Sequence, residues 1–190
     1  MYSLMWPIYA KYWDTMKLSN ANASRVIKAC ENIVRSKKRY LNAEKDSGVP
    51  WYMIGPLHMR ESGLDFSTQL AQGDPLNRVS VHVPKGRGPF NSWEEGAYDA
   101  LVRLKGLQRV IDWRLEKILY YCENYNGWGY WSYHGKMPSP YVWGATSVQK
   151  PGKYVADGVW SSTTMDTQIG CAIMIRVLSQ MEKVILVRED

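Results

Sequence analysis

The 190-residue chain has few of the residues that cross-link small domains or bind metals. It contains 3 cysteines and 3 histidines. An odd number of cysteines at long, irregular separations predicts neither a disulfide framework nor a Cys-x-x-Cys metal site. We therefore expect Cys30, Cys122 and Cys171 to be reduced and packed, and we expect no metal and no cofactor.

Long apolar runs are also missing. No segment reaches the roughly 20 apolar residues that a membrane-spanning helix needs, so stable membrane insertion is not expected. Residues 1–17 are aromatic and apolar, but Pro7, Lys11 and Asp14 interrupt them. They lack a basic start, a clean apolar stretch and a small-residue cleavage site. This segment is not predicted to be a signal peptide.

Phenylalanine is scarce, whereas the other aromatic residues are abundant, with 2 Phe against 9 Trp and 13 Tyr. Trp and Tyr carry a polar group on the ring, which suits flat, hydroxyl-rich or base-like ligands as well as protein cores. The net charge of +6 favours an anionic partner such as nucleic acid, cell-wall glycan or an anionic membrane. The composition is that of a folded protein, and the length predicts one domain over residues 1–190.

The spacing of apolar residues predicts a mainly α fold (α+β) with one small β element. Helices are expected at about 18–43, at 50–62, from a cap at Asn91 or Ser92 to Gly106, at about 107–124, and from a cap at Asp166 to Met181. The alternating run at 78–83 lies between turn-forming residues and predicts a short strand or hairpin. Residues 125–164 are rich in Gly, Pro, Ser and aromatic residues, which is typical of a functional loop region.

Glu61 is the first candidate for catalysis. It lies at the end of the predicted helix 50–62, along a face that holds Ile54, Leu57 and His58. Partial burial in such a place favours the protonated carboxyl group, which suits a proton donor. The alternative is a glutamate that points into solvent at a helix end. Asp65 and Asp74 follow, and two carboxylates that flank a site are what glycoside hydrolysis requires.

Other kinds of site are weakly indicated. His58 and Glu61 are three residues apart and allow a metal pair with His82 or His134, although a hydrogen-bonded core histidine is favoured for His58. Ser62 lacks a G-x-S-x-G turn, and neither a GxxxxGK[ST] loop nor a GxGxxG turn is present. The chain is therefore not expected to be a Ser-His-Asp hydrolase or a nucleotide-binding protein.

Five aromatic residues fall within nine positions at the start of the loop region, and Lys136 is nearby. They are Tyr125, Trp128, Tyr130, Trp131 and Tyr133. Such rings stack on sugars or on nucleic-acid bases, or they pack a rigid loop onto the domain. The composition does not separate these alternatives.

Several stretches of the chain, taken in order, carry a resemblance to a known family. They are VPWYMIGPLHMRES, GDPLNRVSVHVPKGR, SWEEGAYDAL, YNGWGY, SPYVW and GKYVADG, within about residues 34–172. The chain resembles phage endolysins and prophage-encoded proteins of the lysozyme-like superfamily, which are related to goose-type lysozymes and soluble lytic transglycosylases. The resemblance implies a single lysozyme-like domain, with a cleft between the small β element and the loop that begins at Tyr125.

The same resemblance suggests catalytic roles. Glu61 matches the catalytic acid of the family, and Ser62 matches the serine that follows it and supports the substrate. Along the sequence, the separation of Asp74 from Glu61 is like that of a water-positioning aspartate from the catalytic acid in goose-type lysozymes, which makes Asp74 the candidate general base. The family's GLMQ string after the acid is missing, and Asp74 followed by Pro75 equally fits a turn whose side chain caps the backbone.

Substrate-binding roles follow in the same way. Tyr125 and Asn126 resemble the Tyr-Asn pair that lines the glycan cleft of lytic transglycosylases, although the usual AYNAG string is here NYNGWG. Trp128 and Tyr130 are expected to add sugar-binding rings beside that pair.

The implied activity is that of a muramidase, a glycosidase that cleaves the β-1,4 bond between N-acetylmuramic acid and N-acetylglucosamine in peptidoglycan and so lyses bacteria. The alternatives are a lytic transglycosylase that forms 1,6-anhydro products and a non-catalytic glycan- or nucleic-acid-binding protein. The expected partner is the peptidoglycan glycan strand, and nucleic acid is not expected. Such an endolysin is expected to collect in the host cytoplasm and to reach the periplasmic wall once a partner such as a holin opens the inner membrane.

Overall fold

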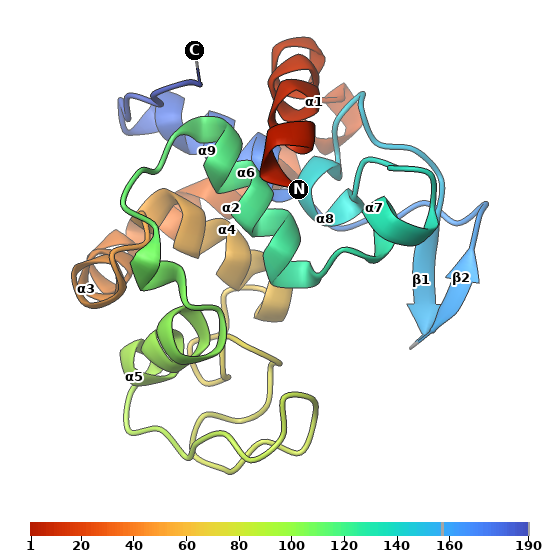
Figure 1. The fold of residues 1–190 in the computed structure, drawn as a ribbon. Coiled ribbons are helices and arrows are strands. Elements are labelled where there is room, and N and C mark those ends of the chain that lie inside the picture. Colours follow the sequence, from red (N-terminus) through yellow and green to blue (C-terminus); the bar gives the residue numbers. More distant parts are fainter. Residues whose placement is uncertain (157, 190) are drawn as a thin grey trace. The chain divides into compact units, whose positions relative to one another are not determined.

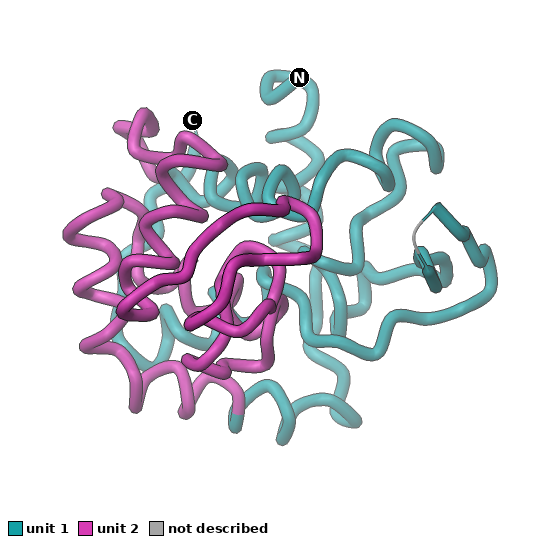
Figure 2. The backbone as a smooth tube through the Cα atoms, turned by 90° about the horizontal axis from the view of Figure 1, so that it is seen from below, with its two compact units in different colours: residues 1–28, 114–190 teal, residues 29–113 magenta. Residues whose placement is uncertain are grey.

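The computed structural model describes residues 1–156 and 158–189, and it is mainly helical with one small antiparallel sheet. The predicted fold class is therefore confirmed. The chain divides into two compact units, coloured separately in Figure 2. Unit 1 consists of residues 1–28 and 114–190, and unit 2 of residues 29–113. The expectation of one domain over 1–190 stays a prediction.

Unit 1 is built around helices that pack on one another. Its elements are α1 (Tyr2–Thr15), the start of α2 (Asn20–Arg35), α6 (Leu115–Asn126), α7 (Gly129–Tyr133), α8 (Pro140–Trp143), β1 (Lys153–Ala156), β2 (Val159–Ser161) and α9 (Cys171–Met181), labelled in Figure 1. Helix α1 packs on α6, and α8 packs on both α6 and α9. Strands β1 and β2 form an antiparallel pair, with Lys153 opposite Ser161. The core is apolar and includes Met5, Ile118, Leu119, Trp143 and Ile175, which are all fully buried.

Unit 2 holds the rest of α2 and a second set of helices. They are α3 (Lys37–Ser47), α4 (Trp51–Ser62), α5 (Trp93–Tyr98), the π-helical segment η1 (Asp99–Leu104) and the short 3-10 helix η2 (Leu107–Arg109). Helix α3 packs on α4 and on α5. A glycine allows α4 to approach α2 closely, because a Cβ atom added to Gly55 would lie 2.5 Å from the Ile33 side chain. A long loop, drawn in yellow and green in Figure 1, joins α4 to α5.

The strand predicted at 78–83 is wrong. The described residues between α4 and α5 contain only one isolated bridge, between Thr68 and Pro75. In this loop the alternation is reversed: Val81 is 67% exposed and Val83 81% exposed, whereas Ser80 is only 3% exposed. The loop bonds to itself, since the Ser80 hydroxyl donates to the Pro84 carbonyl at 2.8 Å. The small sheet lies instead at 153–161, so the β element that was predicted to form one side of the cleft is not formed by residues 78–83.

Three predicted helix boundaries are also wrong. The helix expected at 18–43 is broken at Ser36, which separates α2 from α3. The helix expected from 107 begins only at Leu115, whose N–H donates to the distant Val187 carbonyl at 2.7 Å. Asp166 does not cap α9, because Gly170 precedes the helix and the Asp166 carboxylate accepts from the Gln168 N–H at 2.9 Å. Helix α1 was not predicted.

A buried carboxyl group joins two helices of unit 1. Glu123 on α6 is 1% exposed and accepts a hydrogen bond from the Tyr9 hydroxyl on α1. Its second oxygen has no hydrogen-bond partner among the described residues. Burial raises the pKa of Glu123 to about 7, although the Tyr9 bond acts in the opposite direction.

We expect Glu123→Gln to stabilise the protein at alkaline pH. Because the folded-state pKa is raised above the unfolded value, wild-type stability is lost as pH rises from about 4.5 through about 7, by up to about 3 kcal/mol. Glutamine keeps an acceptor for Tyr9 but has no charge, so this loss is removed. Urea unfolding at pH 5 and pH 8 measures the effect, and the exposed Glu31→Gln is the control. Equal pH dependence in wild type and Glu123→Gln would contradict the assignment.

Candidate active site

The end of helix α4 positions the predicted acid and the serine after it. Glu61 and Ser62 are both half-buried in the last turn of α4, which continues through Pro56 without a break. Gly63 then adopts a left-handed conformation with φ of 63°, which glycine tolerates without strain. The Gly63 N–H donates to the Met59 carbonyl at 3.1 Å and so ends the helix. The chain turns back directly after Glu61 and Ser62.

A buried histidine holds this turn in place. His58 is fully buried, and its Nε2 lies 3.1 Å from the Asp65 carbonyl oxygen. The Tyr40 hydroxyl lies 3.0 Å from Nδ1. Because a carbonyl only accepts, Nε2 carries the proton and Nδ1 accepts from Tyr40. Burial lowers the pKa of His58 to about 4, so the ring is neutral at physiological pH.

Aromatic and cationic groups enclose the same ring. The rings of Phe66 and Trp93 each lie 4.6 Å from His58, centroid to centroid. Arg39 sits 4.0 Å above the Phe66 ring and makes two hydrogen bonds to Glu94, of 2.8 and 2.9 Å. Helices α3, α4 and α5 thus meet at His58. Since both ring nitrogens are taken, His58 is not available for the metal pair with Glu61, and no three metal-ligating side chains gather among the described residues.

Asp74 is buried and braces the loop that follows it. One carboxylate oxygen accepts from the backbone N–H groups of Val81 and His82, at 2.9 and 3.0 Å. The other accepts from the His82 ring at 2.6 Å. The His82 backbone and ring bonds, together with the Val81 N–H, hold the pKa of Asp74 below its ordinary value. Asp74 is therefore ionised at neutral pH, and three donors of its own loop already bind it.

The loop folds back so that its chain reaches the end of α4. A Cβ atom added to Gly73 would lie 3.6 Å from the Glu61 carbonyl oxygen. The Gln69 N–H donates to the Asp74 carbonyl at 2.7 Å and closes the turn between them. The main chain on both sides of the turn is thereby fixed. Within unit 2 the main chain next to Asp74 therefore lies close to the main chain of Glu61.

A charged neighbour of Glu61 was missed from the sequence. Desolvation lowers the pKa of Lys105, and the charge of Glu61 acts to raise it. The two side chains are therefore close enough to interact. Lys105 follows η1 and is far from Glu61 along the chain, so no local spacing pattern connects them.

The other four predicted site residues belong to unit 1. Tyr125 lies near the carboxyl end of α6 and is 7% exposed, as is Tyr130 on α7. Trp128 is half-buried, with its ring 4.8 Å from that of Tyr120. Asn126 is exposed. The two tyrosine rings thus mainly fill the core of unit 1, and Asn126 and Trp128 keep more surface for a ligand.

Tyr130 belongs to an aromatic cluster that the sequence analysis did not define. His134 stacks on Trp160, with centroids 3.5 Å apart and planes inclined by 11°. The His134 Nε2 atom lies 2.9 Å from the Tyr154 hydroxyl. The Tyr130 ring packs edge-on at 5.6 Å from both Tyr154 and Trp160. Strands β1 and β2 supply two of these rings, which only the folded chain places against the 125–136 segment.

No family model, curated protein or solved structure matches the chain. The lysozyme-like resemblance therefore stays an expectation carried by its motifs. No helix in the described part of the chain is long and apolar enough to cross a membrane.

We expect His58→Gln to remove a loss of stability in acid. Because the folded-state pKa is lowered, wild-type stability is present above pH 6.5 and is lost as pH falls through about 4, by up to about 3 kcal/mol. The variant is less stable at pH 7 but loses less between pH 7 and pH 4. Urea unfolding at both values measures this difference. The half-buried His134→Gln is the matched control, and an equal acid dependence of wild type and His58→Gln would refute the buried neutral ring.

Proposed function

We propose that the protein is a peptidoglycan glycosidase, a muramidase that cleaves the β-1,4 bond between N-acetylmuramic acid and N-acetylglucosamine. The observation that carries the proposal is the return of the loop after α4 to the main chain of Glu61 in unit 2. Glu61 is half-buried at the helix end, and Asp74, a second carboxylate, lies next to the glycine at which the loop reaches it. Two carboxyl groups in such an arrangement are the usual requirement for glycoside hydrolysis.

In this proposal Glu61 is the general acid. It gives its proton to the glycosidic oxygen as positive charge develops on the sugar ring. The hydrogen bonds of His58 hold the turn after Glu61, so the main chain that carries the carboxyl group keeps its position. Asp74, kept ionised by His82 and Val81, positions the attacking water with its remaining acceptor capacity.

A second candidate has an observation in its favour. Three donors of the loop already bind Asp74, which also suits a carboxylate that only braces the backbone. Glu61 then acts alone, first as acid and afterwards as base toward the C6 hydroxyl of the muramic acid. The product is a 1,6-anhydro sugar, and the enzyme is a lytic transglycosylase.

The charge and the rings of the chain agree with a wall substrate. The net charge of +6 draws the protein to an anionic polymer. Asn126 and Trp128 keep exposed surface for sugar. Delivery to the wall is proposed to depend on a membrane-opening partner such as a holin. A non-catalytic glycan binder would share these features, and activity separates it from an enzyme.

We expect Glu61→Gln to lower the release of soluble muropeptides from purified sacculi by at least about 100-fold. Loss of the transferable proton removes general acid catalysis, while the isosteric amide preserves the helix end. The exposed Glu31→Gln should release muropeptides at the wild-type rate. An active Glu61→Gln variant would remove Glu61 from the mechanism, and an inactive wild type would leave a binding protein.

Product chemistry decides the role of Asp74. For the muramidase, mass spectrometry of digested sacculi should find reducing muramic acid ends, and Asp74→Asn should lose most of the activity because the amide is a poor base. Anhydro ends with an active Asp74→Asn variant would replace the muramidase with the transglycosylase. A product set with neither kind of end would reject both.

A further inference from the structure

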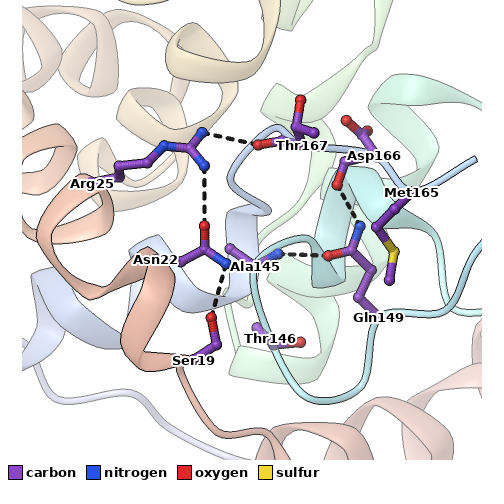
Figure 3. A pocket seen from close by; sticks show the side chains of 9 residues that line it. All are labelled: Ser19, Asn22, Arg25, Ala145, Thr146, Gln149, Met165, Asp166 and Thr167. Carbon is purple, nitrogen blue, oxygen red and sulfur yellow. Dashed lines mark hydrogen bonds between the residues drawn. The ribbon is translucent and has the colours of Figure 1, made fainter.

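A pocket in unit 1 is lined by none of the residues proposed for catalysis. Its volume is about 320 Å³, which falls in the range of small-ligand sites, and Figure 3 shows its lining. Three segments that are distant in sequence contribute side chains. They are Ser19, Asn22 and Arg25 from the start of α2, Ala145, Thr146 and Gln149 after α8, and Met165, Asp166 and Thr167 before α9. We call this the Arg25 pocket.

One wall of the Arg25 pocket is a chain of hydrogen bonds along α2. The Arg25 guanidinium donates to the Asn22 side-chain oxygen at 3.0 Å and to the Thr167 carbonyl at 2.9 Å. The Asn22 amide in turn donates to the Ser19 hydroxyl at 2.9 Å. These bonds, dashed in Figure 3, hold the exposed guanidinium between Asn22 and Thr167. They lower the cost of ordering it when a ligand binds.

The opposite wall is fixed in a similar way. The Gln149 side chain accepts from the Ala145 N–H at 2.9 Å and donates to the Asp166 carbonyl at 2.7 Å. Thr146 is 7% exposed, and its hydroxyl donates to the Trp143 carbonyl at 2.6 Å. Gln149 keeps one amide hydrogen and one lone pair beyond these bonds.

A close contact between two glycines holds the segments at a set distance. The Gly170 N–H donates to the Gly144 carbonyl at 3.0 Å. A Cβ atom added to Gly170 would lie 2.4 Å from the Gly144 nitrogen and 2.5 Å from the Val142 carbonyl oxygen. Any side chain at this crossing would push the segments apart. The main chain at this crossing therefore fixes the separation of the two segments, which both line the Arg25 pocket.

The lining selects a ligand with one negative charge and several hydroxyl groups. Arg25 has five N–H donors, of which two make the bonds described, and the planar group suits a carboxylate. Asp166 is the one acidic residue of the lining, and Lys153 at 3.6 Å offsets its charge. Hydroxyl and amide groups line the walls, and Met165 adds an apolar surface for a methyl group.

We propose that the Arg25 pocket binds an acidic monosaccharide, whose carboxylate pairs with Arg25 and whose hydroxyl and amide groups bond to Asn22 and Gln149. Among the sugars of peptidoglycan, N-acetylmuramic acid has this chemistry when its lactyl carboxylate carries no peptide stem, and it also has an acetamido methyl. The choice of this sugar rests on the proposed function, whereas the preference for a carboxylate rests on the pocket. The protein would then have a second point of attachment on glycan strands whose muramic acid residues carry no peptide stem.

The test is a titration of the full-length, isotope-labelled protein with N-acetylmuramic acid and with the neutral N-acetylglucosamine, followed by amide NMR shifts. We expect the acidic sugar to shift the amides of Ala145, Gln149 and Thr167 and to bind about tenfold or more tightly than the neutral one. Arg25→Gln should remove that preference, and Arg25→Lys should keep only part of it because an ammonium lacks the planar fork.

Arg35→Gln is the matched control. Arg35 also lies on α2 and bonds to an asparagine three residues earlier, at 3.2 Å, but it does not line the pocket. Equal affinity for the two sugars, no binding of either, or equal losses in Arg25→Gln and Arg35→Gln would overturn the proposal. Binding measured in Glu61→Gln keeps the two hypotheses separate. A wild type that binds N-acetylmuramic acid in this pocket but releases no muropeptides would refute only the proposed function. A wild type that releases muropeptides but does not bind N-acetylmuramic acid here would refute only the proposed pocket.

Discussion

The hydrogen bonds of one buried imidazole are the constraint on which the candidate active site depends. His58 joins α3, through Tyr40, to the chain just beyond α4, through the Asp65 carbonyl. Burial keeps the ring neutral, and only a neutral ring has one donor and one acceptor for these two partners. Glu61 lies between His58 and Asp65 in the sequence, so whatever holds those two residues also holds the candidate acid. The aromatic groups around the ring exclude the water that would otherwise compete for its bonds.

The loop after α4 shows how polar groups replace regular pairing. Asp74 and Ser80 are buried and take up the backbone donors and acceptors of the loop, so no strand partner is needed. The valines of the alternating run are left outward as a result. A carboxylate used in this way is both ionised and already bonded. For this reason the same contacts support a water-positioning base and a purely structural aspartate.

Unit 1 contains buried and pocket-lining polar groups whose hydrogen-bonding capacity is only partly used. The glycine crossing at Gly144 and Gly170 sets two walls of the Arg25 pocket, whose polar side chains bond to one another but keep unused donors. Glu123 differs, since it is buried with one oxygen unbonded among the described residues. The first arrangement is prepared for a ligand. The second makes the stability of unit 1 depend on pH. Both arise from side chains brought together from distant parts of the chain.

The sequence alone determined the mainly helical class, the helix that ends at Ser62 and the stop at Gly63, because these follow from local spacing and from glycine's tolerance of positive φ. It did not determine that the 78–83 run forms a loop, because periodicity records alternation but not which face is buried. Only the tertiary structure decided the contact of His58 with Tyr40, the charge interaction of Lys105 with Glu61, and the walls of the Arg25 pocket. Such contacts join residues that are far apart along the chain, and their energies depend on distance in space, which no local pattern encodes.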